Sequence, residues 1–366
     1  MVLKKNKLAF VLPNLNMGGA ERVVSSLANE LSNNYEIIIV TLSGSDSHYH
    51  LHHSIKHIKC STKSIASNNI FQALYNNYVL TKRLKSILKN YSADLVIGFT
   101  TTANILAVIA SKQLNIPCII SERSNPYIYI PNRFWTFLRK LTYNKAHYIV
   151  VQTELVQTFF HQFANQKKVI ILPNPLSGDL IENKKNNSPK ENVILSVGRL
   201  DKNKAQDLLI KAFSNIDNTN WRLVFVGDGV EKQNYINLAK ELKIESKVTF
   251  VGNSSRVYDY YNSSKIFAFT SKSEGFPNVL IEAMYFELPC ISTDCPTGPS
   301  EIIVDGLNGF LIPVNDQTAL ENKLEQLISS EELQKKLGKN ALKTVKKFET
   351  GNVVNKWEKI IQNAIH

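Results

Sequence analysis

The stretch from Ser271 to Ala283 contains the residue types needed to bind a phosphorylated sugar. It reads SKSEGFPNVLIEA and follows an apolar run that predicts a strand, so a glycine-containing turn and then a helix are expected. Pro277 is placed in the first turn of that helix, where a proline costs no hydrogen bond. The start of a helix offers free backbone N–H groups that bind a diphosphate, expected here at Phe276, Asn278 and Val279.

Two glutamates, Glu274 in the loop and Glu282 in the helix, flank this predicted anion site. A carboxylate accepts two hydroxyl hydrogen bonds, which suits both a sugar and a ribose. We therefore expect Glu274 near the sugar and Glu282 near the ribose. The alternative is that Glu282 faces solvent and that Glu274 is an ordinary loop charge.

Short apolar runs alternate with amphipathic stretches along the whole chain. Runs rich in Val, Ile and Leu predict strands of parallel sheets with helices on both faces. The candidates are residues 8–12, 36–42, 95–99, 118–121, 148–152 and 169–172, and then 193–197, 223–226, 248–251, 266–270, 290–293 and 310–314. We therefore expect an α/β protein with two doubly wound, Rossmann-like domains facing across a cleft, with ligands at the carboxyl ends of the strands.

The stretch 177–192 is polar, rich in lysine and asparagine and without periodicity, so it is the predicted linker. The domains are then expected over residues 1–176 and 191–345. The remaining residues, 346–366, are expected to form a helix that packs back on the first domain.

The net positive charge of the chain comes entirely from its first half. Residues 1–178 hold 19 Lys and Arg against 7 Asp and Glu, a net charge of +12, whereas residues 179–366 hold 24 of each. A basic domain beside a neutral one indicates an anionic partner, which could be phospholipid headgroups, lipid-linked diphosphates or nucleic acid. A solvated basic face without a partner is the alternative.

The histidines and cysteines give little sign of metal or redox chemistry. The cluster at His48, His50, His52, His53 and His57 lies in what reads as a polar, solvated connection without acidic partners, so no metal site is expected. The four cysteines have no metal-ligand spacing, and buried thiols are expected, with Cys118 and Cys290 inside apolar runs. No apolar run is long enough to cross a bilayer, which predicts a cytoplasmic protein.

The segment with Glu274 and Glu282 resembles the donor-site signature of family 4 glycosyltransferases, and the resemblance covers nearly the whole chain. It implies the GT-B fold and a retaining transfer from a nucleotide sugar to a hydroxyl group. In that mechanism the departing diphosphate helps to take the proton of the acceptor. The resemblance implies no metal and no cofactor besides the nucleotide-sugar substrate.

The resemblance also assigns residues to the donor. Arg199 and Lys204, which follow residues 193–197, look like the family's basic pair on the diphosphate, whose charge grows as the glycosidic bond breaks. With Glu274 they form the implied catalytic set. Gly18 and Gly19 resemble a glycine loop that lets the backbone approach the donor phosphate or the acceptor.

Four further positions are placed at the base pocket and the acceptor side. Val251 and Asn253 end a strand where the family holds the base, and a neutral Asn253 favours uridine over guanosine. Glu122 and Arg123 follow residues 118–121 and are expected to line the cleft. Many family members have a histidine at that point, and this chain has Arg123.

Residues 132–145 mix aromatic and basic side chains at helical spacing. Their apolar stripe and adjacent cations are Phe134, Phe137, Leu138 and Leu141, with Arg133, Arg139 and Lys140. Such a helix is typical of a membrane interface, although a core helix with snorkelling cations fits the same pattern. Residues 119–125 and 136–143 resemble the polyprenyl-linked N-acetylgalactosamine transferases of bacterial N-glycan assembly.

Together these features predict transfer of a hexose or N-acetylhexosamine, from a UDP-sugar rather than a GDP-sugar, to a lipid-linked or growing glycan. The product would be a polysaccharide, a lipopolysaccharide or a glycoprotein glycan, made at the inner face of the cell membrane by a peripheral protein. No nucleic-acid-binding signature is evident. A nucleotide-sugar epimerase of the same fold and a non-catalytic basic membrane adaptor are the alternatives.

Overall fold

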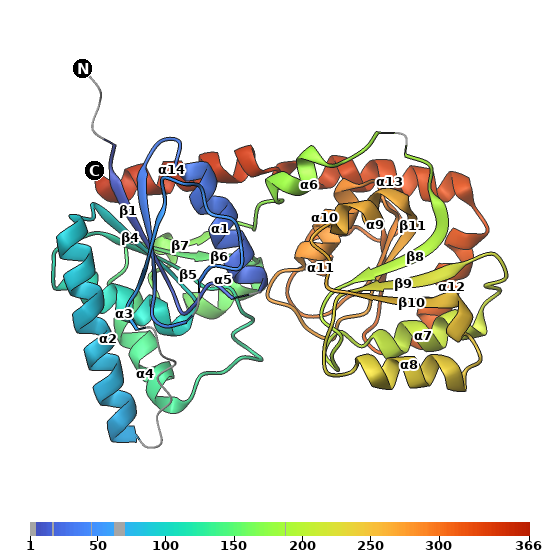
Figure 1. Cartoon of the computed structure of the whole chain (residues 1–366), viewed down its shortest axis with the longest axis horizontal. Coiled ribbons are helices and arrows are strands. Elements are labelled where there is room, and N and C mark those ends of the chain that lie inside the picture. The colour runs from blue at the N-terminus through green and yellow to red at the C-terminus, as the bar shows by residue number, and fades with distance from the viewer. Residues whose placement is uncertain (1–4, 17, 45, 62–69, 187) are drawn as a thin grey trace. The chain divides into compact units, whose positions relative to one another are not determined.

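The computed structural model describes residues 5–16, 18–44, 46–61, 70–186 and 188–366 (Figure 1). The chain forms two compact units. Unit 1 combines Met1–Pro175 with Thr350–His366, and unit 2 is the continuous segment Leu176–Glu349. The unit boundary thus precedes the predicted linker, part of which folds as α6 (Gly178–Glu182), with Leu180 in the core of unit 2.

In the described residues, the sheet of unit 1 has seven parallel strands in the order β3-β2-β1-β4-β5-β6-β7. They are β1 (Lys7–Leu12), β2 (Glu36–Thr41), β3 (Lys56–Lys59), β4 (Leu95–Phe99), β5 (Cys118–Ser121), β6 (Tyr148–Val151) and β7 (Val169–Ile171). The helices are α1 (Gly19–Leu31), α2 (Ile70–Tyr91), α3 (Thr101–Lys112), α4 (Arg133–Tyr143), α5 (Glu154–His161) and α14 (Thr350–Ile365). Strands therefore alternate with helices, as a doubly wound sheet requires.

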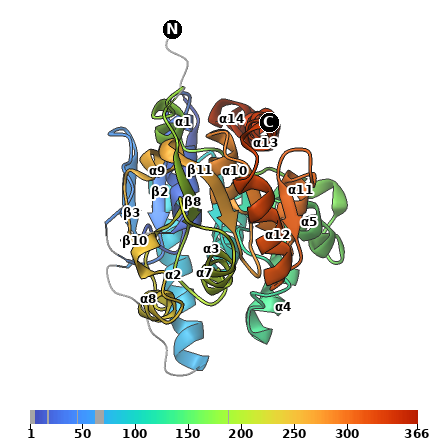
Figure 2. The same ribbon diagram turned by 90° about the vertical axis from the view of Figure 1, so that its right-hand side faces the viewer.

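The sheet of unit 2 has six parallel strands in the described residues, in the order β10-β9-β8-β11-β12-β13. They are β8 (Glu191–Val197), β9 (Arg222–Val226), β10 (Val248–Gly252), β11 (Ser264–Phe269), β12 (Cys290–Thr293) and β13 (Phe310–Ile312). Besides α6, the helices are α7 (Gln206–Asn215), α8 (Lys232–Glu241), α9 (Val257–Ser263), α10 (Asn278–Tyr285), α11 (Pro299–Ile302), α12 (Gln317–Ile328) and α13 (Glu331–Val345). Helices α9 and α10 lie on one side of this sheet, and α7 and α8 lie on the other (Figures 1 and 2).

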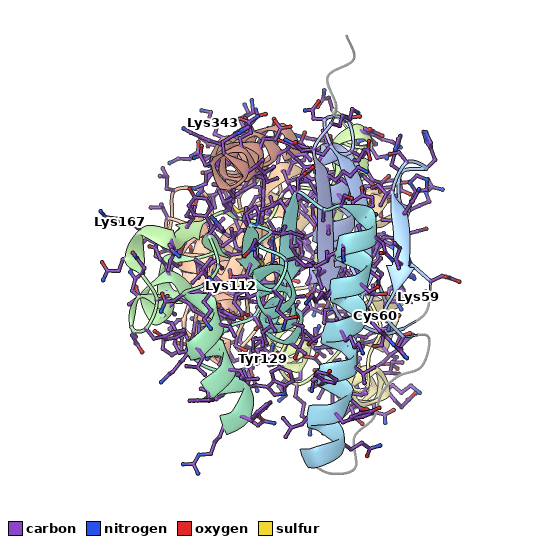
Figure 3. All side chains as sticks on the ribbon, turned by 90° about the vertical axis from the view of Figure 1, so that its left-hand side faces the viewer. Lys59, Cys60, Lys112, Tyr129, Lys167 and Lys343 are labelled. Carbon is purple, nitrogen blue, oxygen red and sulfur yellow. The ribbon has the colours of Figure 1, made fainter. Side chains whose placement is uncertain are left out.

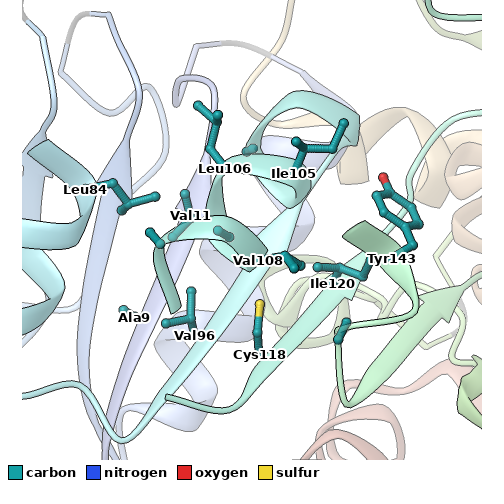
Figure 4. Packing of buried hydrophobic residues seen from close by; sticks show 14 of the residues in the cluster. Ala9, Val11, Leu84, Val96, Ile105, Leu106, Val108, Cys118, Ile120 and Tyr143 are labelled. Carbon is teal, nitrogen blue, oxygen red and sulfur yellow. The ribbon is translucent and has the colours of Figure 1, made fainter. Parts of the chain in front are cut away.

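Both faces of each sheet are buried, which explains the continuous apolar runs. In β1, Leu8 and Phe10 pack in one cluster with α1 and α14, while Ala9 and Val11 pack in another with α2 and α3. Figure 4 shows the second cluster, in which Leu84 and side chains of α3 cover the strands. Alternate residues of one strand thus enter different cores because their side chains point to opposite faces.

The strand β3 was not predicted, and the expected solvated loop at His57 is wrong. Its sequence, KHIK, has no apolar run, and it pairs along the edge of the sheet with β2. His57 is half-buried there, and its Nε2 lies 3.0 Å from the hydroxyl of Thr41. Burial lowers the pKa of His57 below its ordinary value of 6.5.

The four cysteines are buried and unpaired, as expected. Burial raises the pKa of Cys60, Cys118 and Cys295 to about 12, so these thiols stay protonated and behave as core side chains. Among the described residues, no helix has the length and hydrophobicity needed to cross a membrane.

Candidate active site

Two loops of unit 2 carry the predicted catalytic residues. The loop from Gly198 follows β8, and the loop from Thr270 follows β11 and leads into α10. Because β8 and β11 are hydrogen-bonded neighbours in a parallel sheet, their carboxyl ends lie side by side. This edge is where open α/β sheets bind their ligands.

Hydrogen bonds fasten the two loops to each other. The N–H of Lys272 donates to the carbonyl of Asn203 at 2.7 Å, and the amide of Asn203 donates to the carbonyl of Ser273 at 2.9 Å. The hydroxyl of Ser273 donates to Asn203 Oδ1 at 2.8 Å, and that of Thr270 donates to the carbonyl of Lys204 at 2.9 Å. The sequence indicated both loops but gave no sign that Asn203 and Ser273 join them.

The structure brings Lys204 and Glu274 together. The Nζ of Lys204 lies 2.5 Å from Oε1 of Glu274, and the two side chains are 21% and 11% exposed. The ammonium group also lies 5.5 Å from the ring centre of Phe269. A cation and a carboxylate in this partly desolvated place can bind a phosphate and a sugar hydroxyl next to each other.

Arg199 stands apart from this pair. Its side chain is 71% exposed, and its Nε donates to Asp201 Oδ2 at 2.5 Å. Asp201 also accepts the N–H groups of Asn203 and Lys204, so it organises the loop from within. Arg199 therefore lies on the same loop as Lys204, but it makes no ion pair with Glu274 in the described structure.

The start of α10 corrects two expectations. The helix begins at Asn278, so Pro277 is its N-cap residue rather than part of the first turn. The N–H of Asn278 donates to the carbonyl of Phe276 at 3.0 Å and is not free. Among the described residues, the N–H groups of Phe276 and Val279 donate no hydrogen bond, which leaves these two for an anion.

Glu282 is a buried residue of α10, so the solvent-facing alternative is wrong. Its side chain is 2% exposed, and its Oε2 accepts a hydrogen bond of 3.0 Å from the hydroxyl of Tyr261 on α9. Sequence spacing could not show this partner, because Tyr261 comes from a separate helix 21 residues earlier. A hydrogen-bonded carboxylate in a buried place keeps a fixed orientation, which suits binding of a diol.

The other strand ends of unit 2 complete this edge. A Cβ on Gly227 would lie 2.0 Å from the carbonyl oxygen of Gly198, so only glycine permits this approach of the β8 and β9 ends. Val251 is half-buried in β10, and Asn253 follows it with an exposed side chain. These two lie at the same edge of the sheet, but β9 separates their strand from β8.

In unit 1, Gly18 and Gly19 lie at the start of α1, after β1. The N–H of Gly18 donates to the hydroxyl of Tyr49 at 3.0 Å, and that hydroxyl donates to the Gly18 carbonyl at 2.8 Å. A Cβ on Gly18 would lie 2.2 Å from a carboxylate oxygen of Glu21, and burial raises the pKa of that carboxyl. The two glycines belong to a different unit from Lys204, so their approach to the donor stays a prediction.

Glu122 follows β5 and is buried instead of lining an open surface. Its carboxylate accepts hydrogen bonds from the hydroxyls of Tyr143 and Thr101. Burial raises its pKa above the ordinary value, while Tyr143 and Arg139 oppose that rise. These partners on α3 and α4 make Glu122 a link inside unit 1.

Arg123 packs against aromatic rings. Its guanidinium lies 5.3 Å from the ring centre of Phe99 and 6.0 Å from that of Trp357 on α14, and it donates to Asn174. Burial lowers its pKa to about 9. Arg123 therefore holds α14 and the segment before the unit boundary against the carboxyl end of β5.

Helix α4 contains the predicted amphipathic residues, but Arg139 does not lie on its exposed face. Arg139 is 3% exposed and stacks 5.1 Å and 5.6 Å from the ring centres of Phe159 and Phe160. Phe137 and Leu141 are exposed instead. The helix thus combines both alternatives, with one cation in the core and an apolar surface outside.

Two family models match the chain one after the other. The model described as Glycosyltransferase Family 4 matches residues 17–178, and the model described as Glycosyl transferases group 1 matches residues 179–344. No group of three potential metal ligands occurs among the described residues.

Curated relatives extend over almost the whole chain. An α-1,4-N-acetyl-D-galactosaminyltransferase of Campylobacter jejuni, named for GalNAc-α-(1→4)-GalNAc-α-(1→3)-diNAcBac-PP-undecaprenol, is 32% identical over 97% of this chain and 98% of its own. Another from the same bacterium is named as an N-acetylgalactosamine-N,N'-diacetylbacillosaminyl-diphospho-undecaprenol 4-α-N-acetylgalactosaminyltransferase. It is 32% identical and covers 94% of this chain and 96% of its own.

Solved structures show the same fold. HepE of Anabaena in complex with UDP superposes with a TM-score of 0.82 at 19% identity, over 98% of this chain and 100% of its own. TarM superposes with a TM-score of 0.82 at 14% identity, over 98% and 99%. The two Rossmann-like units give the chain the GT-B fold. With the family models and the relatives above, the chain belongs to glycosyltransferase family 4, as its motifs predicted.

Proposed function

We propose that this enzyme transfers a hexose or N-acetylhexosamine from a UDP-sugar to a hydroxyl of a glycan carried on polyprenyl diphosphate, with retention of the anomeric configuration. The Lys204–Glu274 pair beside the start of α10 carries the proposal. The undecaprenol-linked substrates named for the two Campylobacter relatives and the UDP bound to HepE support it.

The donor diphosphate binds the N–H groups of Phe276 and Val279, with Lys204 and Arg199 as its cations. Glu274 accepts a hydroxyl of the sugar, and Glu282 accepts the ribose hydroxyls. The uracil base lies toward Val251 and Asn253. On the acceptor side, Gly18, Gly19 and Arg123 contribute from unit 1.

In the reaction, the bond from the anomeric carbon to the diphosphate oxygen breaks, and the acceptor oxygen forms its bond to that carbon from the same face. The acceptor proton passes to an oxygen of the departing diphosphate. Lys204 and Arg199 stabilise the charge that grows on this leaving group. These cations supply the positive charge, so the proposal includes no metal.

The exposed Phe137 and Leu141 on α4, with Lys140 between them in the sequence, support peripheral binding to the inner face of the cell membrane. The charge of unit 1 acts in the same direction, because each basic residue near anionic lipid adds about 1 kcal/mol.

The deciding experiment measures binding and hydrolysis of a panel of UDP- and GDP-sugars by the purified chain, with and without a lipid-linked acceptor. We expect saturable binding of one UDP-sugar and its loss in Glu282→Ala. Interconversion of two UDP-sugars without an acceptor would identify an epimerase instead. If no donor binds, even with the acceptor present, the result would favour the alternative hypothesis of a non-catalytic membrane adaptor.

A further inference from the structure

The residues that precede the edge strand β3 are fastened to helix α1. This strand ends at Lys59, which is labelled in Figure 3. The side-chain amide of Asn29 on α1 donates to the carbonyl of His50 at 3.0 Å, and its oxygen accepts the N–H of His52 at 2.9 Å. The adjacent Tyr49 is therefore held in a defined position beside the helix.

From this position the hydroxyl of Tyr49 binds both backbone groups of Gly18, at the start of α1. It accepts the N–H of Gly18 at 3.0 Å and donates to the carbonyl of Gly18 at 2.8 Å. The N–H of Gly18 is thus already paired and is not free for a phosphate. A hydroxyl oxygen has two lone pairs, so the oxygen of Tyr49 can still accept one more hydrogen bond.

The carboxylate of Glu21 lies over the same glycine. A Cβ on Gly18 would lie 2.2 Å from Oε2 of Glu21, so only glycine leaves room for this side chain. Burial raises the pKa of the Glu21 carboxyl above its ordinary value of 4.5, and a backbone N–H opposes that rise. The space that the glycine opens is therefore occupied by an acidic group of the chain itself.

An acidic group at this point favours a neutral ligand with hydroxyl groups over a diphosphate. Like charges in a half-buried place repel each other, whereas a carboxylate accepts hydrogen bonds from two hydroxyls. Arg22 is the neighbouring cation that would favour a phosphate instead. Burial raises the pKa of Tyr49, and the backbone of Gly18 and the charge of Arg22 oppose that rise. The test below therefore includes a diphosphate as well as a sugar.

We propose that Glu21 binds hydroxyl groups of the acceptor sugar and that Tyr49 positions the glycine loop for this contact. The carboxylate accepts two neighbouring hydroxyls, and the remaining lone pair of the Tyr49 oxygen accepts a further one. This inference rests on the proposed function for the identity of the acceptor as a glycan. It assigns the glycine loop to the acceptor rather than to the donor diphosphate.

The test compares two ligands on the full chain. Methyl N-acetyl-α-D-galactosaminide is the probe for the acceptor sugar, and its binding is measured by saturation-transfer NMR with UDP present. Calorimetry measures the binding of UDP alone. We expect Glu21→Gln, which keeps the shape of the side chain, to weaken glycoside binding at least tenfold, because a charged acceptor is lost. Tyr49→Phe should weaken it at least threefold, and both variants should keep the affinity for UDP within twofold.

The matched control is Glu30→Gln, which removes the same charge from the exposed side of the last turn of α1. Equal weakening in Glu21→Gln and Glu30→Gln would overturn the site, since unlocalised charge would then explain the effect. Tighter UDP binding in Glu21→Gln with unchanged glycoside binding would assign the loop to the donor diphosphate instead.

Two further results would also overturn the inference. One is that the parent chain shows no saturable binding of the glycoside. The other is that both variants lose glycoside and UDP together with a lower unfolding temperature, which would reduce Glu21 and Tyr49 to a structural role. A chain that transfers sugar yet fails here keeps the proposed function and loses only this site. A chain that binds the glycoside through Glu21 but never transfers sugar keeps the site and loses the proposed function.

Discussion

The ammonium group of Lys204 lies 2.5 Å from a carboxylate oxygen of Glu274, although 70 positions separate the two residues in the chain. Neighbouring strands, β8 and β11, place them together. The bonds of Asn203 and Ser273 between the loops then keep the distance short. The charge pair is therefore a property of the sheet edge and not of either loop alone.

Replacing Glu274 by Gln should reduce the turnover of sugar transfer at least 100-fold, because the sugar loses its carboxylate and Lys204 loses its partner. The substitution should also destabilise unit 2, because it leaves the mostly buried ammonium group of Lys204 without its charged partner. The control Asp207→Asn breaks an exposed pair with Lys211 in the same unit, 3.4 Å apart, and should leave turnover unchanged. Steady-state kinetics with a labelled UDP-sugar check both, and full activity of Glu274→Gln would contradict the site.

Removing the hydroxyl of Tyr261 should destabilise unit 2 by about 1–3 kcal/mol, because the buried Glu282 loses a hydrogen bond. Tyr261→Phe should also weaken UDP binding, since Glu282 is then less well oriented. The control is Tyr258→Phe on the same helix, because the hydroxyl of Tyr258 makes no hydrogen bond within the described structure. Denaturant unfolding and UDP calorimetry measure the two effects. Equal stability of both variants would argue against the role of Tyr261.

Arg123→His tests whether Arg123 simply replaces the histidine of other family members. The shorter imidazole cannot keep the contacts with Phe99, Trp357 and Asn174 together. We expect a loss of about 2 kcal/mol in the stability of unit 1, the scale of a desolvated cation–π contact. Arg133→His, at the exposed start of α4, is the control. Unchanged unfolding and full transfer activity in Arg123→His would show that a histidine suffices.

Acidification should destabilise unit 1 through His57. Its pKa is lowered in the folded state, so the unfolded chain takes up the proton more readily below the ordinary value of 6.5. The stabilising contribution is complete above pH 6.5 and is lost as the pH falls through the lowered pKa. Thermal unfolding between pH 7.5 and 5 should therefore depend less on pH in His57→Gln than in the parent chain. The exposed His50→Gln should keep the pH dependence of the parent chain.

Gly227→Ala should destabilise unit 2 and reduce transfer, because its Cβ would lie 2.0 Å from the Gly198 carbonyl and its φ is +139°. Gly351→Ala is the opposite case, since no atom lies within 4 Å of its Cβ position and it belongs to a helix. We expect that control to gain about 0.5–1 kcal/mol. Parallel denaturant titrations compare the stabilities of the two variants. Similar stabilities would mean that the backbone at Gly198 can shift to accommodate the Cβ of residue 227 at little cost.

The fold was predictable wherever a segment is buried on both sides. The strands β4, β5 and β12 have the predicted bounds, because each is a run of side chains with no solvent-facing member. Edge strand β3 has a different pattern, with exposed Lys56 and partly exposed neighbours, and its residues resemble a loop. Edge strand β10 was predicted although it is only partly buried, because its sequence, VTFVG, is largely apolar. The missing apolar run, and not the position at the edge of a sheet, therefore hides β3.

The candidate site was predictable as a set of residue types but not as a set of contacts. The residues Glu274 and Lys204 were identified, yet their direct contact depends on strand order. The burial of Glu122 and Arg139 was missed, because a charged residue in a sequence is ordinarily expected at the surface. Tyr143 on α4 is the partner of Glu122, and Phe159 on α5 is the partner of Arg139. Each partner is distant in the sequence and leaves no local signal.

Unit 1 is assembled from both ends of the chain, whereas unit 2 is one continuous segment. Trp357 and Val353 of α14 fill the core between α1 and the sheet, so this face is incomplete until the last helix arrives. During synthesis, unit 2 can therefore fold before all the residues of the unit 1 core have been made. A chain cut before Thr350 would contain the whole of unit 2 and would leave an open, aggregation-prone core in unit 1.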